Sequence, residues 1–266
     1  PPVVGAAADS MNYDVGVVAG AGAGRGLAGG GGRSLMPDIR NATTTQPASG
    51  EELAALLAAR TPITEEELGA KGESRIRCVN VRALLSLPEI GTLGGISTRT
   101  GSTVVPALCS SWSGEALGAF NKAEANRLTV PAHAYRLSMI VGVQPAASST
   151  LFAHADVGLP QRFLYTTATD PEAPDKAPAP PSALFPLNVE SLPTDVDRTS
   201  LDAAYEAGSI RGDLHYKLSY MDFPDAAYLE ADRQRLSVLH GADLPPLDAH
   251  LIQLKAKTAA LLALLD

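Results

Sequence analysis

The sequence has few aromatic residues, only two cysteines and no long apolar run. Aromatic residues make up 5% of the 266 residues, so Leu, Val, Ile and Ala must fill the core. Cys78 and Cys109 are too few for a disulfide scaffold and lack the spacing of a metal site, which favours reduced thiols in a cytoplasmic protein. The longest apolar run, Thr258 to Leu265, is shorter than the ~20 residues that span a membrane. No signal peptide is recognisable at the start, and we expect no membrane partner.

Basic residues are also scarce. The chain has 21 Lys and Arg against 29 Asp and Glu, which gives a net charge of −8. A broad nucleic-acid-binding face needs clustered Lys and Arg, so this composition argues against one and leaves open a narrow basic channel or one formed on assembly. The scattered histidines form no pair at metal-ligand spacing, so no zinc site is expected. The chain begins at Pro1 and ends at Asp266 within a helical pattern, which we interpret as a piece of a longer polypeptide.

Short apolar segments alternate with helical patterns along the first two-thirds of the chain. The predicted strands are Tyr13–Ala19, Arg75–Leu87, Tyr135–Val143 and Arg162–Thr167. Helices are predicted after Ser49, which has capping-box spacing to Glu52, and over Gly101–Trp112. Strands separated by helices predict an α/β fold with a mostly parallel sheet that is covered on both faces.

A proline-rich segment divides the chain. Residues 170–186 contain six prolines, each without a backbone donor, which indicates an extended linker. Beyond it, helices are predicted at Pro224–His240 and Leu247–Leu265. We therefore expect a core at residues 1–186 and a helical C-terminal segment at residues 187–266.

A glycine-rich turn follows the first predicted strand. A P-loop places phosphates on the amides of such a turn, with a Lys for the terminal phosphates and then a Ser or Thr for Mg²⁺. Here Ala19 replaces the first Gly, Arg25 replaces the Lys and Gly26 replaces the Ser or Thr. Arg25 keeps the positive charge, whereas Gly26 removes one Mg²⁺ ligand. The candidate nucleotide-binding residues are Gly20, Gly22, Gly24, Arg25 and Gly26.

Two other interpretations of this turn stay open. It is a plain flexible turn, or it is the dinucleotide-binding fingerprint, whose spacing is met by Gly24, Gly26 and Gly29. The fingerprint needs an acidic residue about 20 positions further on, after a second strand. Glu51 and Glu52 stand near that distance but within a predicted helix.

Three polar residues at strand boundaries are the catalytic candidates. In P-loop ATPases, acidic residues after an apolar strand hold Mg²⁺ and activate the attacking water. Glu89, after VRALLSLP, is the only acid at that place, and a Glu at a helix N-terminus is the competing interpretation. Gln144 stands where a polar sensor touches phosphate or water, or where a strand end is capped. Arg162, which opens a strand, is either an arginine finger for a γ-phosphate or a structural Arg.

Several segments together resemble the helicase-like ATPase modules of actinobacterial and phage proteins, which are often fused to primase-polymerase domains. The similar segments cover most of the chain: SGEELAALL, the Glu89 segment with Thr92 and Leu93, RTGSTVVPALCSSWSGEALG, AYRLSMIVGVQP, GLPQRFLY and the region 248–265 with His250 and Lys257. GVQP and PQRFL at their spacing are the specific parts.

This resemblance implies a RecA-like P-loop NTPase core, ATP and Mg²⁺ as cofactors, a ring-shaped homo-oligomer and a part in DNA replication of mobile elements. DNA contacts are expected through the assembled or full-length protein. Arg162 is implied to act as a finger across a subunit interface. Arg25, Gly26 and the single acid Glu89 depart from the family pattern at its catalytic positions. The expected functions are therefore an ATP-driven motor, or a weakened homologue that serves as a structural or nucleotide-sensing subunit, with a dinucleotide-binding enzyme as the third possibility.

Overall fold

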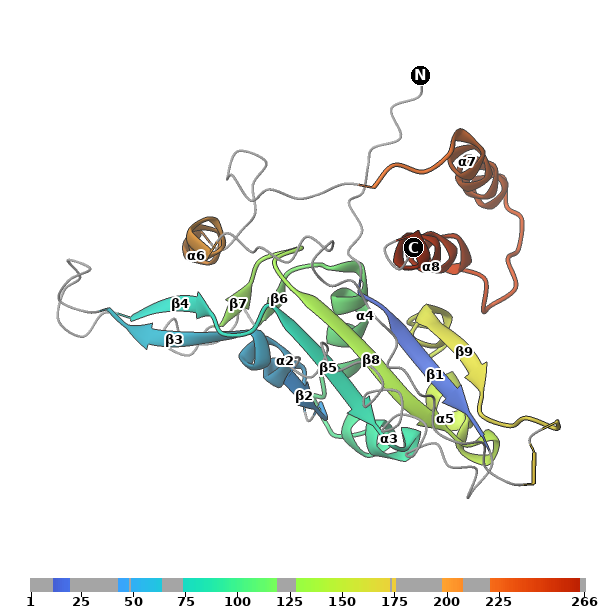
Figure 1. Ribbon diagram of the computed structural model, residues 1–266, viewed down its shortest axis with the longest axis horizontal. Helices are drawn as coiled ribbons and strands as arrows, with labels where there is room; N and C mark the ends of the chain where they lie inside the picture. The colour runs from blue at the N-terminus through green and yellow to red at the C-terminus, as the bar shows by residue number, and fades with distance from the viewer. Residues whose placement is uncertain are drawn as a thin grey trace.

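The centre of the computed structural model is a wholly parallel, five-stranded sheet of order β2-β5-β8-β1-β9 (Figure 1). The structure describes residues 12–19, 43–47, 49–63, 74–118, 128–172, 174–175, 198–207 and 221–263. The strands are β1 (Asp14–Val18), β2 (Thr43–Thr45), β5 (Arg82–Leu87), β8 (Arg136–Val143) and β9 (Phe163–Thr167). The prediction of an α/β protein with a mostly parallel sheet is confirmed.

The helices between the strands form one connected layer that packs on the sheet. These helices are α2 (Gly50–Leu57), α3 (Ile90–Ser97), α4 (Val104–Ser113) and α5 (Ser149–Phe152). Helices α2 and α3 contact α4, and α3 contacts α5. Every second residue of β5 and β8 is buried and joins the same hydrophobic core as these helices: Ala83, Leu85, Leu87, Leu137, Met139, Val141 and Val143.

Helix α2 begins as its sequence predicts. The Ser49 hydroxyl accepts the backbone N–H of Glu52 at 3.2 Å, which satisfies one of the free donors at the helix start. The next residue must be glycine, because a Cβ on Gly50 would lie 2.4 Å from the Thr103 hydroxyl oxygen. These two residues let the start of α2 approach the residue that precedes α4.

The predicted strand Arg75–Leu87 is in fact two strands. Its first part is β4 (Ser74–Cys78), which pairs antiparallel with β3 (Ala58–Pro62) in a separate ribbon, and its second part is β5. Figure 1 shows this ribbon extending away from the central sheet. The chain turns between the two strands because the Asn80 side-chain amide donates to the Leu56 carbonyl at 2.7 Å, and the Val79 N–H donates to Leu57 at 2.8 Å. A second short ribbon joins β6 (Leu117–Gly118) and β7 (Thr129–Val130).

Three helices follow β9 in the chain. They are α6 (Arg198–Ala207), α7 (Asp225–Leu239) and α8 (Leu251–Ala263), so helices are confirmed within the predicted ranges 224–240 and 247–265, and residues 264–266 lie outside the described residues. Helix α6 packs against β4, and α8 packs against the 3₁₀ turn Pro160–Arg162 that precedes β9.

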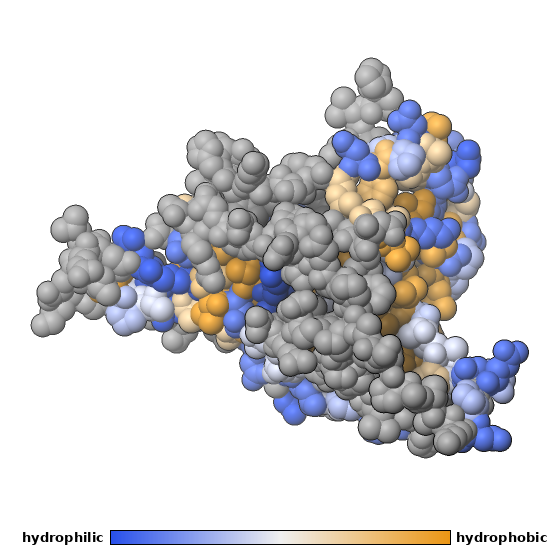
Figure 2. All heavy atoms as spheres, viewed as in Figure 1, coloured by the Kyte–Doolittle hydropathy of each residue, from blue (hydrophilic) through white to orange (hydrophobic). Residues whose placement is uncertain are grey.

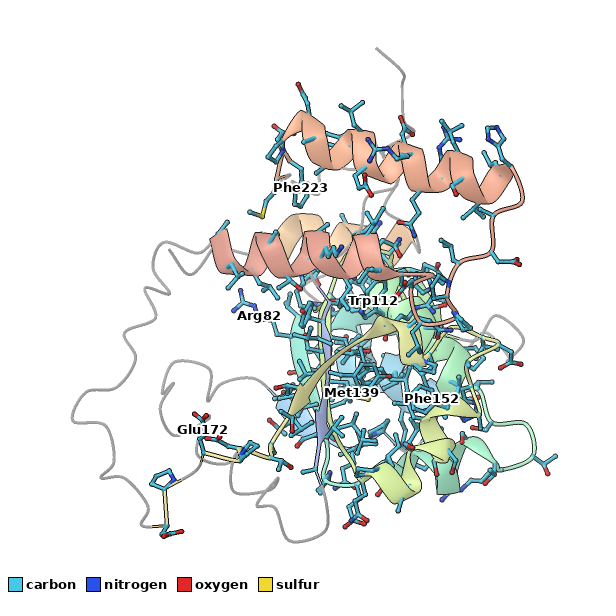
Figure 3. The ribbon with its side chains drawn as sticks, turned by 90° about the vertical axis from the view of Figure 1, so that its right-hand side faces the viewer. Arg82, Trp112, Met139, Phe152, Glu172 and Phe223 are labelled. Atoms are coloured by element: carbon cyan, nitrogen blue, oxygen red, sulfur yellow. The ribbon has the colours of Figure 1, made fainter. Side chains whose placement is uncertain are left out.

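A buried lysine fastens α8 to the core. The Lys257 side chain is only 3% exposed, and its ammonium donates to the carbonyls of Asn12 at 3.0 Å and Trp112 at 2.5 Å. The same ammonium stands 3.5 Å from the centre of a Trp112 ring, and Figure 3 shows Trp112 close beneath the C-terminal helices. Two carbonyls and an aromatic face thus replace the water that a buried ammonium loses.

We predict that Lys257→Met lowers the free energy of unfolding by about 3 kcal/mol, because it leaves two buried carbonyls without a donor and removes a cation near the buried carboxylate of Asp14. Urea unfolding curves measure this loss. Lys255→Met, at an exposed position of the same helix, is the matched control and should change stability by no more than about 0.5 kcal/mol. Equal losses in the two variants would contradict the anchoring role of Lys257.

Candidate functional site

The carboxyl ends of the parallel strands share one edge of the sheet, which we call the carboxyl edge. Val18 pairs with Val143, and Leu87 pairs with Val141. Extending the β5 register by two residues puts Glu89 level with Val143. Because neighbouring strands are about 4.8 Å apart, the ends of β1, β8 and β5 lie within roughly 10 Å along this edge. Three segments that are distant in sequence therefore meet at the carboxyl edge, toward which the arrowheads point in Figure 1.

The glycine-rich turn begins at this edge, directly after strand β1. Ala19 is buried, and its N–H donates to the Val143 carbonyl at 3.1 Å, so the pairing with β8 continues to the residue where the turn begins. The chain after β9 also pairs here, since the Ala168 N–H donates to the Val18 carbonyl at 3.0 Å. The candidate residues of the turn itself lie outside the described residues: Gly20, Gly22, Gly24, Arg25 and Gly26.

Glu89 follows β5 and occupies the position before the first turn of α3. It has extended backbone angles and an exposed side chain, and its carboxylate does not cap the helix. Both interpretations from the sequence thus describe the same position, because the helix starts directly at the strand end. Within the described part of the chain, no hydrogen bond or ion pair involves this exposed carboxylate.

Gln144 follows β8 at the same edge. It precedes the 3₁₀ turn Pro145–Ala147, and its backbone carbonyl accepts the Ala147 N–H at 2.9 Å. The half-buried side chain makes no capping hydrogen bond. The Gln144 side chain therefore does not cap the turn that follows β8.

Arg162 lies at the opposite edge. Phe163, the next residue, pairs with Asp14 at the start of β1, so Arg162 is at the amino ends of the strands. Its guanidinium donates to the Gly158 carbonyl at 2.6 Å and lies 5.6 Å from the centre of a Trp112 ring. A five-residue strand is about 16 Å long, which separates Arg162 from the other three candidates. Within one chain Arg162 does not take part in the same site.

Sequence reasoning missed a buried charge cluster at this amino edge. The Asp14 carboxylate, 5% exposed, accepts the Met139 N–H at 3.0 Å. Burial raises the pKa of Asp14 to about 7, and the positive charges of Lys257 and Arg162 and the Met139 hydrogen bond act in the opposite direction. The available signal was an acidic residue inside the apolar strand DVGVV. Since the Lys257 ammonium is bound to two carbonyls, we interpret the cluster as structural.

Two other groups that look reactive have ordinary roles. The His154 Nε2 lies 3.2 Å from the Ser97 hydroxyl, but this hydroxyl donates to the Gly94 carbonyl at 3.2 Å, so its proton is not directed at the histidine. Burial raises the pKa of the Cys109 thiol, which donates to the Val157 carbonyl at 3.6 Å. Neither pair forms an activated nucleophile.

Comparison of the chain with protein-family models, with curated proteins and with solved structures finds no match. Among the described residues, no group of three or more His, Cys, Asp or Glu side chains is arranged to hold a metal ion. No helix in the same part of the chain has the length and apolar character needed to cross a membrane. The candidate site therefore rests on the geometry of the carboxyl edge.

We predict that stability falls between about pH 4 and pH 7 because of Asp14. In this window the folded protein keeps the Asp14 proton, whereas the unfolded chain, with its pKa near 3.8, has lost it. The folded state then binds more protons, so raising the pH favours unfolding until both states are ionised above pH 7. Asp14→Asn should flatten this dependence in thermal unfolding measured from pH 4 to pH 8. Asp222→Asn, at an exposed carboxylate, should leave it as in the wild type, and the opposite ranking would contradict the assignment.

Proposed function

We propose that this protein binds ATP at the carboxyl edge, as a RecA-like P-loop core of the helicase type whose hydrolytic motifs are weakened. The single observation that carries the proposal is the meeting of three strand ends at that edge. They bring together the start of the glycine-rich turn, Glu89 and Gln144. The sequence predicts a separate role in nucleotide binding for each of these three features. A nucleotide site needs all three roles together.

Each residue has a defined task in this proposal. The amides of the glycine-rich turn receive the phosphates, and Arg25 neutralises the terminal ones. The exposed Glu89 carboxylate faces the cation that accompanies a nucleotide, and orients the attacking water. Gln144 donates its free amide to the γ-phosphate or to that water. A carboxylate and a side-chain amide at neighbouring strand ends suit Mg²⁺–ATP, in which Mg²⁺ would neutralise charge at the phosphates.

The strand order favours this proposal over a dinucleotide-binding enzyme. In dinucleotide-binding sheets the first strand has the second strand as a neighbour. Here the neighbours of β1 are β8 and β9, while β2 lies at the far side of the sheet. The neighbours of β1 therefore differ from those of the first strand in a dinucleotide-binding sheet.

A nucleotide-sensing subunit is the second candidate within the same fold. Gly26 provides no hydroxyl for Mg²⁺, and Glu89 is the only acid at the end of β5. Such a site holds ATP through the turn while the water-activating chemistry is poorly supported. The net charge of −8 favours a subunit that leaves contacts with DNA to other parts of an assembled protein.

We predict Mg²⁺-dependent ATP binding that weakens at least tenfold in Arg25→Ala, because the terminal phosphates lose their cation. Glu89→Gln should change the affinity less than about threefold and lower any turnover at least tenfold. Titration calorimetry and a phosphate-release assay measure the two quantities. Lys255→Ala and Glu115→Gln, both exposed and outside the carboxyl edge, serve as charge-matched controls.

The outcomes separate the candidates. Binding without turnover supports the nucleotide-sensing subunit, and turnover that needs Glu89 supports the motor. If Arg25→Ala and Glu89→Gln both leave a measured turnover unchanged, the motor assignment is wrong. Binding of NAD in place of ATP would overturn both candidates.

A further inference from the structure

Helix α7 has no buried residue along its entire length. The structure describes all 15 of its residues, and several large apolar side chains are open to solvent: Tyr228 at 46%, Leu229 at 65%, Leu236 at 43% and Leu239 at 68%. Figures 1 and 3 show α7 beyond α8, on the side away from the sheet. In Figure 2 apolar side chains are visible over α7 and α8. A helix of this length gains most of its stability by packing an apolar side, but no residue of α7 is buried, and only Ala231, Asp232, Gln234 and Ser237 are half-buried.

Four of the five exposed large apolar side chains of α7 lie on one side of the helix, and the fifth, Val238 at 46% exposure, lies on the opposite side. Successive residues rotate by about 100°, so Leu229 and Leu236, seven apart, are aligned. Tyr228 and Leu239, eleven apart, are aligned beside them. Asp232 lies within the same stripe, and its carboxylate pairs with the Arg235 guanidinium at 3.2 Å. We call this set of four apolar residues the α7 stripe.

The charges of α7 are divided between its two halves. Residues 225–232 carry three carboxylates and no base, and residues 233–239 carry two guanidinium groups and no acid. Within each helix Glu230 pairs with Arg233 and Asp232 pairs with Arg235. Antiparallel pairing of two α7 helices also sets the acidic half of each against the basic half of the other, which attracts near the middle of the contact. Parallel pairing sets like charges together. The helix is therefore electrostatically complementary to a reversed copy of itself.

We propose that α7 is a self-association helix, which pairs through its stripe with α7 of a second copy in the antiparallel direction. Such a contact is isologous and closes at two copies, because each α7 presents the same surface to the other. Two helices of this length bury less than the ~1,600 Å² of a standard interface, so the dimer forms and dissociates with concentration. The proposal goes beyond nucleotide binding and does not depend on it.

Sedimentation equilibrium of the full chain over a wide concentration range tests the proposal. The wild type is expected to pass from monomer to dimer as its concentration rises. Leu229→Lys adds a cation opposite the basic half of the partner helix, and Leu236→Glu adds an anion opposite its acidic half. Each change also removes an apolar contact, so each should weaken association at least tenfold.

Ala227→Lys and Gln234→Glu are the matched controls. They make the same charge changes in the same halves of α7, but on the side away from the stripe, and they should leave the dissociation constant within about twofold. Thermal unfolding of all four variants should match the wild type, since α7 buries nothing. A wild type that stays monomeric throughout, or stripe variants that associate as well as the controls, would overturn the proposal. Assembly beyond the dimer that is insensitive to all four variants would overturn it too.

Cysteine cross-linking tests the direction of pairing. With the centre of the contact between Asp232 and Arg233, residue 229 of one copy lies beside residue 236 of the other, and Asp232 of each copy faces Arg233 of the other. A mixture of Leu229→Cys and Leu236→Cys chains should therefore cross-link far more than either chain alone, above the background of the native Cys78 and Cys109 in the wild type. If each chain alone cross-links as readily as the mixture, the helices are parallel and the proposal is wrong.

Discussion

The parallel pairing of β1 with β8 is the constraint on which the rest of the molecule depends. β1 has only five residues, and β8 holds each of them in register from Asp14 opposite Met139 to Val18 opposite Val143. This single ladder places the start of the glycine-rich turn at the carboxyl edge and the Asp14 carboxylate at the amino edge. A shift of the register by one residue would expose the buried side of β1 and displace both ends of the strand. The candidate site and the charge cluster therefore both depend on this register.

The amino edge shows how the chain tolerates buried charge. Asp14 loses its hydration on the helix-covered side of the sheet, and Lys257 brings a cation from α8, near the end of the chain. Buried charges of this kind seldom add much net stability compared with apolar residues, but removing one partner leaves the other unpaired. The main effect of this arrangement is therefore to fix the position at which α8 packs on the core. Its net contribution to the free energy of unfolding is small. An apolar residue at position 257 would pack equally well in several positions along the edge.

Four of the five strands of the sheet could be predicted from the sequence because buried parallel strands are short, nearly continuous apolar runs. The edge strand β2 was missed, since its three threonines form no such run. YRLSMIVGV and the segment before Ala19 have that form, and the residues after them fall at the carboxyl edge, where Glu89 and Gln144 are found. The ribbon of β3 and β4 could not be predicted in this way, because the strand pattern runs through Asn80 and only its hydrogen bond to Leu56 reveals the turn. The burial of Lys257 could not be predicted either, since nothing in a helical pattern shows that the distant carbonyls of Asn12 and Trp112 accept its protons.

Arg162 illustrates why a residue type at a strand boundary does not by itself define a role. An Arg before a parallel strand and a Glu after one lie at opposite edges of the same sheet. Both residues became candidates because they stand at strand boundaries, regardless of which edge each boundary occupies. Because Trp112 and Gly158 hold Arg162 at the amino edge, it could reach the nucleotide site that we propose only at the carboxyl edge of another copy. Antiparallel contact through α7 joins identical surfaces of two copies about a two-fold axis. In contrast, a contact between the amino edge of one copy and the carboxyl edge of another joins two different surfaces. An arginine-finger role would therefore need a second, heterologous contact, distinct from the α7 contact and able to build a ring on its own.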